Sequence, residues 1–126
     1  MQIPVIHPMP FANAPYSRAM FDDEWIFVSG TIGMDYVTRH LPETAEEQVV
    51  QMMRNIEDYL TRCGGDLRNV VNYTLIIAGQ EHVPAVIQGL WELLPTKPTG
   101  TAMIAGIALP GALVEMQVIA RKSHRG

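Results

Sequence analysis

The chain has 126 residues, which is enough for one domain with a hydrophobic core and too few for two. Its net charge of −4, with nine scattered Lys and Arg residues, argues against a nucleic-acid-binding protein. No apolar run is long enough to span a membrane, and the proline-rich N-terminus lacks the basic start of a signal peptide. A single cysteine, Cys63, excludes an internal disulfide, so a cytoplasmic location is expected.

The N-terminal third of the chain predicts a β-hairpin. Its parts are an extended lead-in (1–13), a short strand (14–20), a turn at Asp22-Asp23 and a stronger strand (24–29) that Gly30 ends. Because side chains alternate along a strand, Tyr16 and Arg18 should share one face of the first strand.

A helix follows the next loop. Thr44 is suited to cap its N-terminus, and Glu47 completes a capping-box pattern three residues later. Apolar residues recur at helical spacing from Val49 to Leu60, and the Gly64-Gly65 pair should end the helix.

The C-terminal half predicts one strand, a second helix and a hairpin. The parts are a β-branched strand (70–78), a helix from about His82 to Leu94 with Pro84 in its first turn, and two strands (101–107 and 112–120) joined at Leu109-Pro110-Gly111. The order β-β-α-β-α-β-β predicts an α+β fold, with two helices on one face of a single sheet.

Several of these strands are apolar on both faces, as the runs Leu75–Ile77 and Leu113–Ile119 illustrate. Two helices can cover only one face, so the other face needs a different cover. A closed, symmetric homo-oligomer is therefore expected.

Few residues indicate chemistry by their pattern alone. The four histidines lack metal-ligand spacing, so no metal site is expected. Glu115 lies in the middle of an apolar strand, where it is either an outward-facing residue or an acid, base or water-positioning group. Ser29 is either a turn residue or a ligand contact. Tyr16 and Arg18 are either an exposed pair or a phenol and a guanidinium that bind a carboxylate.

Several segments together resemble a known family. They are Ala14–Ser17, Phe27–Asp35, Gln48 and Asn55-Ile56 in the first helix, Asn69–Val71, Pro98, and the segment from Leu109 to Ala120. In this order and spacing they resemble the Rid (reactive intermediate deaminase) family, also called YjgF-like proteins or the endoribonuclease L-PSP family. The resemblance covers the chain from about Asn13 onward, so residues 1–126 are expected to form a single domain of this family.

The resemblance implies a chorismate-mutase-like fold assembled as a homotrimer, with ligand clefts between subunits. It also implies hydrolysis of reactive enamines or imines without a metal or organic cofactor. In such deaminases the glutamate of the last strand positions water, which assigns that role to Glu115. The resemblance places Tyr16 and Ser29 in the cleft as substrate contacts.

One departure from the family pattern bears on activity. The family's carboxylate-binding arginine, two residues after the proline, corresponds to Gly100, and a frequent cysteine two residues later corresponds to Ala102. The segment Gly100, Thr101, Ala102 is therefore expected to line a wider or more apolar cleft, and Arg18 is the candidate to supply the missing charge.

Two functions remain open. One is a deaminase or hydrolase that acts on an enamine, imine or related metabolite other than the standard 2-imino acids. The other is a ligand-binding or regulatory trimer that has lost deaminase activity because Gly100 replaces the arginine. Neither involves a nucleic acid or a membrane as partner.

Overall fold

The computed structural model describes residues 1–3 and 14–123, so the predicted lead-in lies mostly outside the described residues, as do His7 and His124. One mixed sheet carries two helices. Two short 3-10 turns are also present: Leu67–Asn69 directly precedes β4, and Gln80–His82 directly precedes α2. The elements are β1 (Gln2–Ile3), β2 (Ala19–Phe21), β3 (Trp25–Ile32), α1 (Ala45–Arg62), β4 (Val70–Ile77), α2 (Val83–Leu93), β5 (Thr99–Ile104) and β6 (Val114–Arg121).

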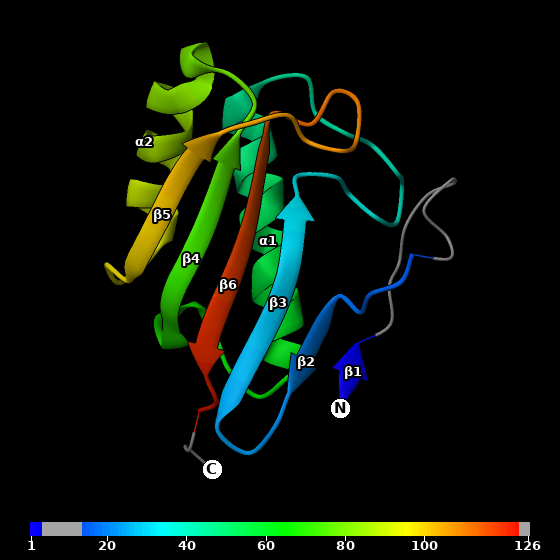
Figure 1. Cartoon of the computed structure of the whole chain (residues 1–126), viewed down its shortest axis with the longest axis vertical. Coiled ribbons are helices and arrows are strands. Elements are labelled where there is room, and N and C mark those ends of the chain that lie inside the picture. The colour runs from blue at the N-terminus through cyan, green and yellow to red at the C-terminus, as the bar shows by residue number, and fades with distance from the viewer. Residues whose placement is uncertain (4–13, 124–126) are drawn as a thin grey trace.

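The strands lie in the order β1-β2-β3-β6-β4-β5, and both helices pack on the same face of the sheet (Figure 1). All neighbouring strands are antiparallel except β4 and β5, which are parallel and connected through α2. The α+β architecture with two helices on one face is therefore as predicted. The other side, here called the open face, carries no helix among the residues that the structure describes.

The predicted N-terminal hairpin forms, but its strands have different limits. β2 and β3 are antiparallel, and the Asp22 carboxylate accepts hydrogen bonds from the backbone N–H groups of Glu24 and Trp25, both at 2.8 Å. β2 begins at Ala19, so Tyr16 and Arg18 precede the strand. Gly30 does not end β3. It lies in a bulge, where the register against β6 shifts between Val28 and Thr31.

The predicted C-terminal hairpin is wrong. The turn at Leu109–Ala112 does form, with the Ala112 N–H donating to the Leu109 carbonyl at 3.1 Å. However, β4 lies between β5 and β6. A strand that follows a helical crossover packs parallel to the strand before the crossover, which places β5 beside β4 at the sheet edge. β6 instead fills the space between β3 and β4.

The predicted helix signals are confirmed. The Thr44 hydroxyl accepts a hydrogen bond from the Glu47 N–H at 3.2 Å and caps α1. At the other end, Gly64 adopts a positive φ of 89°, and the Gly65 N–H donates to the Leu60 carbonyl at 2.8 Å. Pro84 lies in the first turn of α2.

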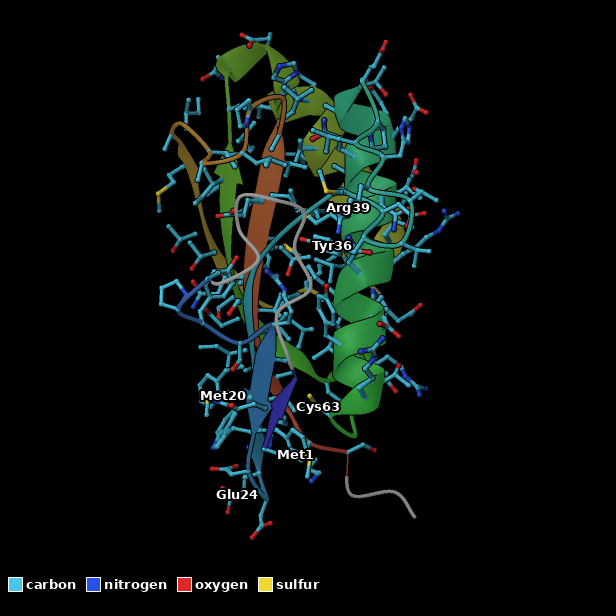
Figure 2. The ribbon with its side chains drawn as sticks, turned by 90° about the vertical axis from the view of Figure 1, so that its right-hand side faces the viewer. Met1, Met20, Glu24, Tyr36, Arg39 and Cys63 are labelled. Carbon is cyan, nitrogen blue, oxygen red and sulfur yellow. The ribbon has the colours of Figure 1, made fainter. Side chains whose placement is uncertain are left out.

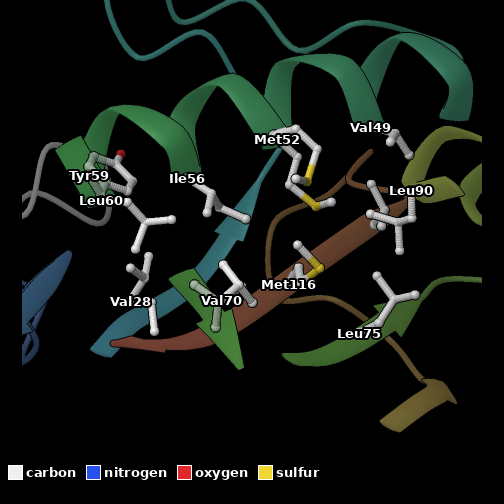
Figure 3. Close-up of a cluster of buried hydrophobic side chains, with 14 of the residues drawn as sticks. Val28, Val49, Met52, Ile56, Tyr59, Leu60, Val70, Leu75, Leu90 and Met116 are labelled. Atoms are coloured by element: carbon white, nitrogen blue, oxygen red, sulfur yellow. The ribbon is translucent and has the colours of Figure 1, made fainter. Parts of the chain in front are cut away.

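The main core lies between the helices and the sheet (Figure 3). Alternate residues of β6, namely Val114, Met116 and Val118, are buried there against α1 and its neighbours. On the open face, side chains such as Phe27 and Met103 remain about half exposed in the single chain. Among the helices of the described residues, none is long and apolar enough to cross a membrane.

Candidate functional site

Glu115 lies on the open face of β6, between Ile32 of β3 and Ile76 of β4. Its neighbours Val114 and Met116 point the other way, into the core. The Glu115 side chain is half-buried, and this burial raises the pKa of its carboxyl group above the ordinary value of 4.5, while the Arg18 charge acts in the opposite direction. A half-buried carboxylate with a raised pKa is suited to exchange protons or to hold a water molecule.

The bulge in β3 makes room for this carboxylate. A Cβ atom added to Gly30 would lie 2.9 Å from Glu115 Oε2 and 3.0 Å from its carboxyl carbon. The glutamate side chain therefore lies directly over the Gly30 backbone. Any larger residue at position 30 would displace it.

Arg18 is completely buried, which the sequence did not predict. Its Nη2 donates hydrogen bonds to the Gly30 carbonyl and to Thr31 Oγ1, both at 2.9 Å. Its guanidinium carbon lies 5.3 to 5.8 Å from the ring centres of three tyrosines, Tyr16, Tyr36 and Tyr59. We call this arrangement the Arg18 cage. Figure 2 shows Tyr36 on the loop after β3, next to α1.

Two tyrosines of the cage, the partly buried Tyr36 and the buried Tyr59, remain protonated. Burial raises the pKa of Tyr36 to about 12 and also raises the pKa of Tyr59, against the lowering effect of the Arg18 charge. The guanidinium is therefore a charged group beside the neutral phenols of Tyr36 and Tyr59.

Tyr16 and Ser29 line a shallow pocket of about 440 Å³ beside β2 and β3. Tyr16 is 42% exposed, and its hydroxyl lies 3.5 Å from Arg18 Nη1. The Ser29 hydroxyl donates to the Ser17 carbonyl at 2.6 Å, which fixes its orientation. Gln117 also lines this pocket, two residues from Glu115 on the same face of β6. The structure thus brings together Tyr16, Arg18, Ser29 and Glu115.

The β5 residues lie elsewhere in the chain. Gly100 pairs with Tyr73 on the helix-covered side of the sheet, and a Cβ atom at Gly100 would overlap the Tyr73 ring. Thr101 faces the open side, and Ala102 shares the side of Gly100. All three are exposed at the sheet edge. With β4 between β5 and β6, one chain does not bring them to Glu115.

A second groove, of about 410 Å³, lies between α2 and the segment leading into β5. Sequence reasoning missed it. Its walls include Tyr73, Ile87 and Trp91, and its one lysine, Lys97, places its ammonium 4.3 Å from the centre of the Trp91 ring. The sequence feature that could have indicated this groove is the spacing of Ile87 and Trp91, which lie one helical turn apart and outside the buried stripe of α2.

Metal ligands are not gathered in the part of the chain that the structure describes, where no three His, Cys, Asp or Glu side chains could hold an ion. Cys63 is buried at the end of α1, and burial raises the pKa of its thiol. A protonated, buried thiol is a poor nucleophile.

The fold defines a class of small α+β proteins with two helices on one face of a single sheet, and the comparisons with known proteins agree with this fold class. A relative from Capra hircus, named 2-iminobutanoate/2-iminopropanoate deaminase, is 34% identical over 113 residues, which are 88% of this chain and 82% of the relative. A human protein of the same name is 30% identical over the same shares of the two chains. The crystal structure of RidA from an Antarctic Psychrobacter species superposes with a TM-score of 0.82 at 23% identity, covering 95% of this chain and 94% of the other.

The family model described as endoribonuclease L-PSP matches residues 7–122. The chain therefore belongs to this family, which is the YjgF/Rid family of the sequence resemblance.

Proposed function

We propose that the protein is a cofactor-free deaminase that hydrolyses an enamine, an imine or a related reactive metabolite in clefts between the subunits of a homotrimer. Residues 1–126 would act as one domain, in the cytoplasm, on a small molecule and without a nucleic-acid or membrane partner. Relatives named 2-iminobutanoate/2-iminopropanoate deaminase support the reaction class. The net charge of −4 fits a small-molecule enzyme better than a nuclease.

The observation that carries this proposal is the position of Glu115. Its carboxylate is half-buried on the open face over Gly30, close to the pocket of Tyr16 and Ser29. In the proposed reaction the carboxylate accepts a proton from water as the water oxygen adds to the imine carbon. The carboxyl group then returns this proton to the nitrogen, which gives a carbinolamine. The carboxylate next takes the proton of the new hydroxyl group and passes it to the amino group, so that the C–N bond breaks and ammonia leaves as the carbonyl forms.

A trimer would complete the site. Glu115 lies on the open face, whereas Gly100 and Ala102 lie on the other side of the sheet at its β5 edge. We propose that the β5 edge of one copy meets the open face of the next, so that Gly100, Thr101 and Ala102 form the wall opposite Tyr16, Ser29 and Glu115. This arrangement would also cover the exposed Phe27.

Gly100 favours a substrate other than the standard 2-imino acids. Glycine provides no charge for a substrate carboxylate, and the Tyr73 ring occupies the space that a side chain from position 100 would enter. The same observation favours the second candidate, a trimer that binds a ligand without turning it over. In either case the cleft is more apolar than one with an arginine at this place.

The test is release of ammonia from 2-iminobutanoate and 2-iminopropanoate, generated in place by an amino-acid oxidase, followed by a wider set of imines with larger apolar groups. We expect little acceleration with the two small acids and clear acceleration with a bulkier imine. If no imine is turned over but a product-like oxo acid binds saturably, the second candidate function, a ligand-binding trimer without catalysis, is correct.

The trimer has its own test. Light scattering on a sizing column should give three times the chain mass of 14.0 kDa. Phe27→Asp should lower that mass because it places a charge on the open face, whereas Val37→Asp, on an exposed loop, should leave it unchanged. If the unaltered chain has the mass of a monomer, the proposed cleft between subunits is wrong.

A further inference from the structure

We infer that Arg18 is a positioning residue for Glu115: from inside the protein, its guanidinium fixes the β3 bulge on which the Glu115 carboxylate rests. The role rests on the proposed function of Glu115. It differs from direct contact with a substrate carboxylate, because the Arg18 side chain is completely buried in the single chain.

The first argument is geometric. Arg18 Nη2 binds the Gly30 carbonyl and Thr31 Oγ1, which belong to consecutive residues of the bulge. Thr31 in turn donates its hydroxyl to the Ser29 carbonyl at 2.7 Å. The three residues 29–31 are thus tied together by hydrogen bonds. The Glu115 carboxylate lies against the Gly30 member of that group.

The second argument is electrostatic. Tyr16, Tyr36 and Tyr59 surround the guanidinium from the segment before β2, from the loop after β3 and from α1. The phenols of Tyr36 and Tyr59 are neutral near pH 7, because burial raises the pKa of Tyr36 to about 12 and raises that of Tyr59 as well. On α1, Asp58 and Arg62 also act on Tyr59, but they neutralise each other in an exposed ion pair at 3.0 Å. The Arg18 charge therefore acts on the Glu115 carboxylate across the bulge.

The third argument concerns the two ends of the same guanidinium. Nη2 holds the bulge beneath Glu115, while Nη1 lies 3.5 Å from the Tyr16 hydroxyl. One rigid, planar group thus fixes the relative positions of Tyr16 and Glu115. Lysine cannot reproduce this arrangement, because an ammonium lacks the planar fork of donors.

The test uses the unaltered protein and needs no enzymatic activity. With arginine side chains labelled with ¹⁵N, the Arg18 resonances should shift as Glu115 titrates, and Glu115→Gln should abolish that step. The matched control Glu57→Gln, on the exposed side of α1, should leave it in place. If the Arg18 resonances show no pH-dependent shift that Glu115→Gln abolishes, the inference is wrong and Arg18 is a packing residue only.

Variants then separate charge from geometry. Arg18→Lys keeps the charge, so the pH at the midpoint of the Glu115 titration should change little. Because lysine loses the hydrogen bonds to the bulge, hydrogen exchange of the Gly30 and Thr31 amides should become at least tenfold faster. Arg18→Gln removes the charge and should raise the Glu115 midpoint. An unchanged midpoint in folded Arg18→Gln contradicts the inference, and if that variant does not fold, the titration of the unaltered protein decides. Absence of deaminase activity with a coupled titration would refute the proposed function and leave this inference standing.

Discussion

Around Glu115, charged and polar groups are buried and held by hydrogen bonds, whereas along β5 the strand is exposed and bordered by an apolar, aromatic groove. The first region has one guanidinium that contacts groups from four parts of the chain. The second has glycine at position 100 and a single lysine resting on a tryptophan. A half-buried carboxylate beside a hydrogen-bonded bulge suits a chemical step that many substrates share, while an exposed apolar wall suits the choice among substrates.

The largest effect is expected for Glu115→Gln, which keeps the shape of the side chain and removes its proton-accepting oxygen. Turnover of any accepted imine should fall about 10²–10⁴-fold, the usual contribution of a general acid or base. Ligand binding, measured by calorimetry, should persist because the β5 wall is untouched. Glu57→Gln, on the exposed side of α1, is the control and should retain full activity. Equal activity of both variants would remove Glu115 from the mechanism.

A matched pair of glycine substitutions compares the two regions directly. Gly30→Ala adds a methyl group 2.9 Å from Glu115 Oε2, so it should displace the carboxylate and reduce turnover about tenfold or more. Gly100→Ala adds a methyl group that overlaps the Tyr73 ring, so it should lower the free energy of unfolding by about 1 kcal/mol through overpacking. Rate assays and urea denaturation of both variants are the measurements. The comparison fails if Gly100→Ala is the variant that loses turnover and Gly30→Ala the one that loses stability.

The pH dependence of stability should show the buried carboxylate. Burial raises the pKa of Glu115 in the folded state above its ordinary value of 4.5, so the folded chain binds this proton more tightly than the unfolded chain. The resulting stabilisation is complete below the ordinary pKa and is lost as the pH rises through the folded value. The unfolding free energy of the unaltered chain relative to Glu115→Gln should therefore fall over that interval. Denaturation of both proteins at equal concentration across the interval measures the difference, and a constant difference would contradict the raised pKa.

The smallest effect is expected at the groove. Lys97→Met removes an exposed cation–π contact with Trp91, which is worth about 0.5–1 kcal/mol, so thermal denaturation should shift only slightly. Its effect on binding should be larger for anionic ligands than for neutral ones. A large loss of stability would show that this groove is as tightly built as the surroundings of Glu115.

The sequence predicted local features well because their causes are local. Thr44 and Glu47 are three residues apart, and the cap that they form depends on little else. The turn at Leu109–Ala112 likewise follows from Pro110 and Gly111, the latter with a φ of 88°. A turn does not determine which strands pair in the sheet, and the prediction of a β5–β6 hairpin was therefore wrong. Strand pairing depends on the crossover through α2 and on which strand buries the most surface, and neither is visible in a turn motif.

The sequence named candidate site residues but not their arrangement in space. Tyr16, Ser29 and Glu115 were singled out by their positions in the predicted strands and then by family resemblance, and the structure places them on one side of the sheet. The burial of Arg18 was not predicted, because arginine is rarely buried and its tyrosine partners come from separate segments. Tyr36 and Tyr59 lie 18 and 41 residues after Arg18 in the sequence, and the pattern of one segment cannot indicate partners so far away.

The Arg18 cage also constrains how the chain folds. A guanidinium that leaves water without its partners raises the free energy steeply, and these partners come from the segment before β2, from β3, from the following loop and from α1. The N-terminal hairpin therefore cannot dock stably on the sheet before α1 is in place, and α1 cannot close over an unpaired cation. We therefore expect both to be consolidated in the same step, so that this half of the molecule assembles all-or-none. Tyrosine fluorescence and far-ultraviolet circular dichroism should accordingly report one common refolding rate.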